Sequence, residues 1–259
     1  MQVTVLGCGG SGGVPLANGN WGSCNPDNPR NRRRRVSVLV KHQGANILID
    51  TSPDLRLQLL DAKLSKIDAV LYTHDHADHC HGIDELRALS YEKNGQPIDA
   101  YGTAATMAAL RQRFAYIFSQ VEGSVSGLYR PVLRAHEIDE MAFSAAGVQV
   151  IPFDQDHGFG AVSTGYRIGS FAYSTDLVEL PAAAKAALGG LDLWVVDCLR
   201  FEPHPTHTHF ERTLGWIAEL KPKRAILTHL NHTVDYDELA RRCPPGVEPG
   251  FDGLTVELP

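Results

Sequence analysis

The chain has 259 residues, of which 43% are hydrophobic and 21% are charged, and these proportions exclude a disordered or fibrous protein. A formal net charge of −6 argues against an extended nucleic-acid partner, although small anionic ligands stay compatible with it. Five scattered cysteines without paired spacing favour a reducing, cytoplasmic location. The sequence shows neither a signal-peptide pattern nor an apolar run long enough to cross a membrane. We therefore expect one soluble domain over residues 1–259.

Short β-branched and apolar runs separated by turn residues predict strands, and stretches with helical spacing between some of them predict helices. The predicted strands are residues 3–6, 36–41, 45–50, 69–73, 148–153, 171–174, 193–197 and 224–228. The predicted helices are residues 84–91, 104–114, 180–188 and 210–220. An insertion or a lid is compatible with the interval 115–142. The chain therefore belongs to the mixed α and β class.

The densest group of ligand-type side chains directly follows the predicted strand 69–73. Its members are His74, His76, Asp78 and His79. A turn after the strand can direct the first two histidines to one metal and the Asp-His pair to another. Imidazole and carboxylate ligands suit zinc, manganese or iron, and the absence of thiolates argues against a structural zinc of the cysteine type. A solvated loop with a coincidental histidine cluster is the alternative, but four ligands at this spacing form a specific motif.

The H-x-H-x-D-H motif after a strand resembles the signature of the metallo-β-lactamase superfamily, and the rest of the chain supplies the family's remaining parts in order. The resemblance implies an α+β fold, a four-layer αββα sandwich with two metals at one edge between the sheets. It implies that the first metal is held by His74, His76 and His157, and the second by Asp78, His79 and His229, with Asp176 shared. It also implies that Asp50 supports these ligands without binding metal.

Within the superfamily, the chain resembles most the PhnP-like branch, which includes phosphoribosyl cyclic phosphodiesterases. The matching segments are residues 6–15, 32–37, 82–87 and 228–232, together with His207. Such relatives often carry a Cys-x-Cys-x-x-Cys cluster that a C-terminal histidine completes. This chain keeps only Cys24 there, so we predict no structural zinc and expect His232 to stand behind the active site without thiolate partners.

Three further features bear on substrate binding. Residues 7–12 spell G-x-G-x-x-G, but a loop follows instead of a helix, which favours a tight turn near the active site over a nucleotide cradle. In the basic run 30–35, the alternation of a strand would put Arg33 and Arg35 on one face, where they are candidate phosphate-binding residues; a solvated basic face is the alternative. Alignment to relatives assigns His207 to phosphate binding or to protonation of the leaving oxygen.

These observations predict a hydrolase with two divalent metal ions, Zn²⁺ or Mn²⁺, with iron also compatible. Asp78 and His207 are the candidate catalytic residues. The expected reaction is hydrolysis of a small cyclic phosphate of ribose or of a nucleotide by a hydroxide shared between the metals. Two rival functions stay open, a lactone or thioester hydrolase of the same fold and a non-catalytic binding protein similar to PqqB. The expected partner is a small phosphorylated substrate, without extended nucleic acid or membrane; a homodimer is compatible.

Overall fold

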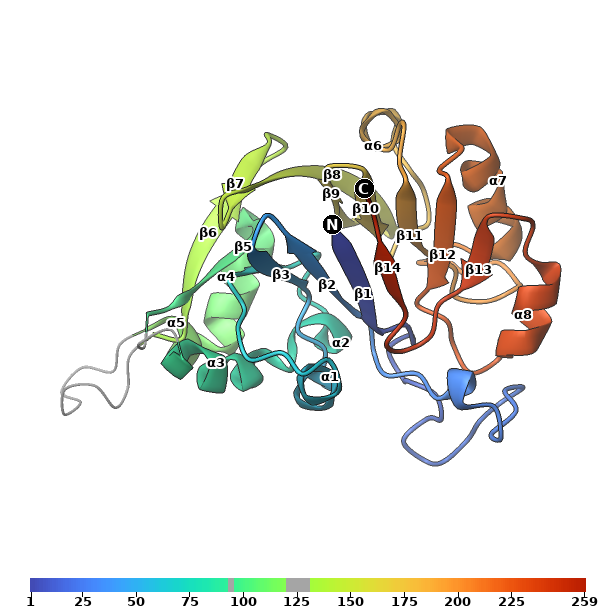
Figure 1. Cartoon of the computed structure of the whole chain (residues 1–259), viewed down its shortest axis with the longest axis horizontal. Helices are drawn as coiled ribbons and strands as arrows, with labels where there is room; N and C mark the ends of the chain where they lie inside the picture. The colour runs from blue at the N-terminus through green and yellow to red at the C-terminus, as the bar shows by residue number, and fades with distance from the viewer. Residues whose placement is uncertain (93–95, 120–130) are drawn as a thin grey trace.

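Two seven-stranded sheets form the centre of the computed structural model, which describes residues 1–92, 96–119 and 131–259 (Figure 1). The first sheet has the order β14-β1-β2-β3-β4-β5-β6, with β1 Gln2–Gly7, β2 Ser37–His42, β3 Ala45–Ile49, β4 Ala69–Leu71, β5 Ile98–Thr103, β6 Leu133–Ile138 and β14 Thr255–Glu257. The second has the order β13-β12-β11-β10-β9-β8-β7, with β7 Phe143–Ala145, β8 Val148–Gly158, β9 Ala161–Ile168, β10 Phe171–Ser174, β11 Leu193–Asp197, β12 Arg224–Thr228 and β13 Val247–Pro249.

Helices cover the outer face of each sheet, and Figure 1 shows the two groups of helices on opposite sides of the molecule. The first sheet carries α1 Leu55–Asp61, α2 Ala77–Cys80, α3 Leu86–Glu92, α4 Ala104–Arg113 and α5 Ala115–Phe118. The second carries α6 Ala182–Ala187, α7 Phe210–Leu220 and α8 Tyr236–Arg242. Two 3-10 turns, η1 Pro29–Asn31 and η2 Ile83–Glu85, lie in the connections. The four-layer αββα arrangement predicted from the sequence is confirmed.

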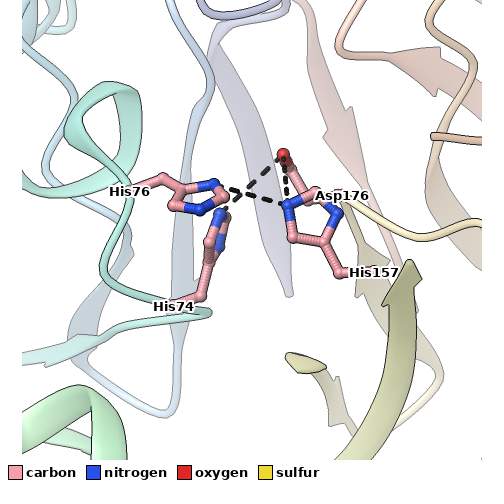
Figure 2. Close-up of side chains that lie close together, drawn as sticks. All are labelled: His74, His76, His157 and Asp176. Atoms are coloured by element: carbon pink, nitrogen blue, oxygen red, sulfur yellow. Dashed lines mark hydrogen bonds and ion pairs between the residues drawn. The ribbon is translucent and has the colours of Figure 1, made fainter. Parts of the chain in front are cut away.

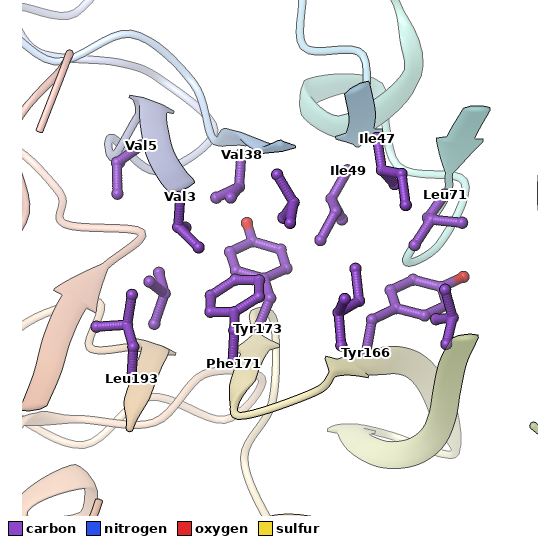
Figure 3. Packing of buried hydrophobic residues seen from close by; sticks show 14 of the residues in the cluster. Val3, Val5, Val38, Ile47, Ile49, Leu71, Tyr166, Phe171, Tyr173 and Leu193 are labelled. Carbon is purple, nitrogen blue, oxygen red and sulfur yellow. The ribbon is translucent and has the colours of Figure 1, made fainter. Parts of the chain in front are cut away.

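Alternating side chains explain why the strands read as nearly continuous apolar runs. In β3, Ile47 and Ile49 point into the core between the sheets, whereas Leu48 packs under the helices of the first sheet. In β11, Leu193 faces the inner core and Trp194 packs against the helices of the second sheet. Figure 3 shows the inner core, where valine and isoleucine side chains of the first sheet meet the rings of β9 and β10. Strands buried on both faces need apolar residues at every position.

Several predicted elements agree with the structure in position and length. Residues 193–197, 224–228 and 210–220 have the predicted bounds as β11, β12 and α7. The predicted strand 148–153 is too short, because β8 continues to Gly158. The insertion or lid considered for the interval 115–142 falls largely on residues 120–130, which lie outside the described part of the chain; the described part of the interval includes α5 and β6.

The carboxyl ends of parallel strands meet at one edge of the sandwich. β10, β11 and β12 run parallel in the second sheet, and β3 and β4 run parallel in the first. Loops at such ends are where α/β sheets present functional groups. Among the residues described, no helix combines the length and the apolar character needed to span a bilayer.

Candidate metal centre and active site

The structure brings all seven sequence-predicted ligands together at this edge. His74 and His76 lie in the loop after β4, and Asp78 and His79 lie on the short helix α2 that follows. Asp176 and His229 stand just beyond β10 and β12. The sequence pattern placed the remaining ligand, His157, after a strand, whereas the structure has it within β8, just before the turn to β9. Four separate segments therefore contribute to one site.

The first group of ligand atoms comes from His74, His76, His157 and Asp176 (Figure 2). The Nδ1 atom of His76 lies 3.4 Å from Nε2 of His157. The Oδ1 atom of Asp176 lies 3.8 Å from Nε2 of His74 and 3.8 Å from Nε2 of His157. Three ring nitrogens and one carboxylate oxygen thus point toward a common centre, as Figure 2 shows. Such a donor set suits zinc, manganese or iron.

The second group faces the other oxygen of Asp176. Its Oδ2 atom lies 3.0 Å from Nε2 of His79 and 3.4 Å from Nε2 of His229. The Oδ2 atom of Asp78 lies 3.4 Å and 3.5 Å from the same two nitrogens. The two oxygens of Asp176 thus face different sets of histidines. A carboxylate in this position can bridge two metal ions.

Hydrogen bonds behind the ligands fix their orientation. Asp50 is fully buried, and its Oδ2 atom accepts a hydrogen bond of 2.7 Å from Nδ1 of His79, so Nε2 of that ring is turned toward the metal group. Thr73 donates its backbone N–H and its hydroxyl to the same carboxylate, at 2.8 Å each. On the other side, Nδ1 of His157 donates to the carbonyl of Thr206 at 2.8 Å. Such contacts set the tautomer and direction of a metal-binding imidazole.

Matching turns hold the carboxylates Asp50 and Asp176 after β3 and β10. Both residues adopt positive φ values, 61° and 56°, which side chains other than glycine rarely take. The hydroxyl of Ser37 donates to the carbonyl of Asp50 at 2.9 Å, and the hydroxyl of Ser163 donates to that of Asp176 at 2.8 Å. His229 has a similar φ of 58°. Strained backbone held by buried polar contacts is typical of functional sites.

The buried polar atoms of the site fit bound cations. Nε2 of His74, His79 and His229 is buried without a hydrogen-bond partner, and leaving such groups unpaired is costly. Burial lowers the pKa of His229, but the carboxylates of Asp176, Asp78 and Asp197 outweigh it and raise that pKa to about 9. These buried carboxylates therefore favour positive charge at the ring nitrogens. Divalent metal ions would satisfy both the nitrogens and the carboxylates.

His207 lies beside the metal groups and pairs with a carboxylate that the sequence analysis did not single out. Its Nδ1 atom is 3.1 Å from Oδ2 of Asp197, the buried last residue of β11. Its Nε2 atom is 3.8 Å from Oδ1 of Asp176, and its ring stacks on that of His229. This geometry admits both a proton-donating role and a place as a metal ligand in a further group with Asp176 and His229. Asp197 was missed because a carboxylate that ends a predicted strand carries no motif of its own.

The structure does not support the prediction that Arg33 binds a substrate phosphate. Its side chain is buried, and its guanidinium donates to the carbonyls of Val234 at 2.8 Å and Asn231 at 3.2 Å. The residues before β2 are not in regular strand alternation, since β2 begins only at Ser37. Arg35 forms an ion pair of 2.9 Å with Asp54. Neither arginine is among the described residues that line the cavities at the site.

Two cavities open at the ligands and share Ser11, His207 and His229. The first, of about 300 Å³, contains His76, His157 and Asp176 and extends to the turn between β8 and β9. The second, of about 280 Å³, lies under the loop 10–13 and is lined by His204, Asn231 and His232. The structure thus places His232 at a cavity wall, and the glycine-rich loop next to the active site. Cys24 is buried, and its thiol donates to the carbonyl of Val234 at 3.2 Å.

Comparison with known proteins identifies the family of this chain. Residues 45–230 match the family model of the β-lactamase superfamily domain. The octanoyltransferase of Porphyromonas gingivalis is 32% identical over an alignment of 260 positions that covers 99% of this chain and 51% of that protein, so the chain spans about half the length of this curated relative. The crystal structure of a new diphosphatase from the PhnP family is 36% identical with a TM-score of 0.90, and the match covers 100% of this chain and 98% of that one.

A more distant structure shares the fold. Zinc-bound PqqB from Methylobacterium extorquens superposes with a TM-score of 0.75 at 21% identity, over 100% of both chains. The family model covers the segment that contains all seven candidate ligands, and the match to the PhnP-family diphosphatase extends over the whole length. The chain therefore belongs to the metallo-β-lactamase superfamily and is a PhnP-like member of it.

Proposed function

We propose that this protein is a dinuclear metal-dependent phosphodiesterase that hydrolyses a small cyclic phosphate of ribose or of a nucleotide. The observation that carries the proposal is the position of Asp176, whose two oxygens face two separate groups of histidines. Two divalent ions held there would supply an activated water at neutral pH and neutralise the phosphate oxygens. The likeness to a PhnP-family diphosphatase favours phosphorus over carbon as the centre attacked.

The chain's own residues supply the remaining functions. Asp50 and Thr206 orient the ligand rings from behind, through His79 and His157. His207, held by Asp197, has its Nε2 atom at the edge of both cavities and can protonate the departing oxygen of the ester. Expulsion of a sugar alkoxide at neutral pH needs such a proton. Asp78 would contribute to catalysis as a ligand of the second metal ion, together with His79 and His229.

Two rival functions are a lactone or thioester hydrolase and a binding protein without catalytic activity. The same site can attack the carbonyl carbon of a lactone or thioester, and the fold is shared with PqqB. The complete set of seven ligands favours an enzyme over a protein that only binds.

The test is a substrate panel with protein loaded with Zn²⁺ or Mn²⁺. Cyclic nucleotides, ribose cyclic phosphate, a lactone and a thioester are compared by product formation. We expect turnover of the phosphodiesters, and loss of at least about 10³-fold in Asp176→Asn because the shared ligand is weakened. His42→Ala, at a histidine at the end of β2, is the control and should keep full activity. Turnover of only the lactone or thioester would contradict the proposal, as would no turnover of any substrate.

A further inference from the structure

One large aromatic side chain stands out at the rim of the first cavity. Phe159 is 87% exposed, although it lies only two residues after the ligand His157. Single exposed apolar residues are common, so exposure by itself indicates nothing. The backbone makes Phe159 unusual, because its φ of 53° lies in the left-handed region, which bulky side chains rarely adopt.

The turn that carries Phe159 is anchored to the loop of the proposed acid. Gly158 has a φ of 85°, and a Cβ atom at this position would lie 2.4 Å from the carbonyl oxygen of Pro205. The neighbouring His157 donates to the carbonyl of Thr206. Two close contacts therefore fix the end of the β8–β9 hairpin against the segment that leads to His207. The backbone that carries Phe159 is therefore held next to the cavity.

The same cavity contains metal-group residues and the exposed ring. Its walls include His157, Asp176 and His207 together with Phe159. Because two residues span at most about 7 Å, the backbone of Phe159 lies close to that of His157. A substrate whose phosphate lies at the ligands would therefore occupy the cavity that Phe159 also lines.

We propose that Phe159 is a specificity-determining residue that stacks on the base of a nucleotide substrate. The inference rests on the proposed phosphodiesterase function and narrows its substrate class to phosphate esters that carry a base. A ribose phosphate without a base would leave the exposed ring of Phe159 without a contact. Aromatic side chains accept any base because every base has a π-face, so Phe159 selects for the presence of a base and not for its identity.

The test compares four proteins on two ligands that differ only by the base. The proteins are the wild type, Phe159→Ala, Phe159→Trp and Val162→Ala, all loaded with metal. Val162 is the matched control, since it is 54% exposed on the same hairpin but does not line the cavity. KM and kcat are measured for an adenosine 2′,3′-cyclic phosphate and for the corresponding ribose cyclic phosphate. Calorimetry gives the Kd of adenosine monophosphate and of ribose phosphate.

We expect Phe159→Ala to raise KM and Kd for the adenosine ligands by about 5- to 100-fold, the range of base–aromatic stacking, and to change neither value for the ribose ligands. Phe159→Trp should restore tight binding, and Val162→Ala should behave as wild type. Equal effects on both ligands, or on neither, would overturn the inference. A shift from dimer to monomer in light scattering of Phe159→Ala, without a change in Kd, would show instead that the ring is a subunit contact.

The outcomes separate this inference from the proposed function. If wild-type protein hydrolyses neither phosphodiester, the proposed function fails, while calorimetry still decides whether Phe159 recognises a base. If it hydrolyses both and Phe159→Ala shows no selective loss, the function stands and the role of Phe159 is wrong.

Discussion

Replacement of His207 by alanine tests whether this chain uses a protein acid. Nε2 of His207 lies 3.8 Å from the shared carboxylate, and its Nδ1 atom is held 3.1 Å from the buried carboxylate of Asp197. An imidazole oriented in this way can deliver a proton at the site where the ester bond breaks. We expect a loss of roughly 10²- to 10⁴-fold in turnover of a phosphodiester with an alkoxide leaving group. This corresponds to about 3 to 5 kcal/mol of activation free energy.

The assay compares two leaving groups. A p-nitrophenolate departs without a proton, so His207→Ala should lose less than about tenfold with a p-nitrophenyl phosphodiester. A residue that only held the phosphate would matter equally for both substrates. His209→Ala is the control, since His209 lies at the start of α7 and is not among the described residues that line either cavity. Equal losses on both substrates, a selective loss in the His209 variant, or loss of a metal ion from His207→Ala would refute the reasoning.

Three further predictions follow from individual contacts. Asp197→Asn should lower turnover of the alkoxide substrate by about 10-fold or more while metal content is unchanged, because the carboxylate orients His207 and is not itself a candidate ligand; loss of metal by elemental analysis would argue otherwise. Cys24→Ser should leave metal content and melting temperature nearly unchanged, since one thiolate falls short of a tetrahedral site, and a lost equivalent of zinc would overturn this. Burial raises the pKa of Asp252 to about 6 from 3.8, so its protonated form stabilises the fold at low pH and this contribution is lost as the pH rises through 6. Denaturation of wild type and Asp252→Asn should show the wild type losing stability relative to the variant between about pH 4 and pH 6, and parallel curves would contradict the assignment.

The sequence indicates the fold well where strands are buried on both faces. The runs at β3, β10, β11 and β12 contain apolar residues at consecutive positions, so their existence and approximate bounds are readable from composition alone. β9 was missed because residues 161–168 include Thr164, Gly165 and Arg167 and lack a clear alternation. The three-residue strands β13 and β14 are too short to show any period.

Four candidate ligands were readable from the sequence as a motif, and the family resemblance supplied the other three, His157, Asp176 and His229. Asp197 and Phe159 were not readable in either way, since their roles arise from contacts between segments far apart in the chain: Asp197 with the loop of His207, and the turn of Phe159 with Pro205. Arg33 shows the opposite error. Its place in a basic run suggested an exposed cation, but the backbone carbonyls that bind it come from residues about 200 positions later.

We propose that seven residues of this chain hold two metal ions that share Asp176. Elemental analysis of metal-replete protein tests it most directly, together with the same measurement on Asp78→Ala and His229→Ala. We expect about two equivalents per chain for the wild type and about one for each variant, because each variant removes a ligand of the second group only. A reproducible single equivalent in the wild type, with Asp78 and His229 dispensable for binding, would contradict it.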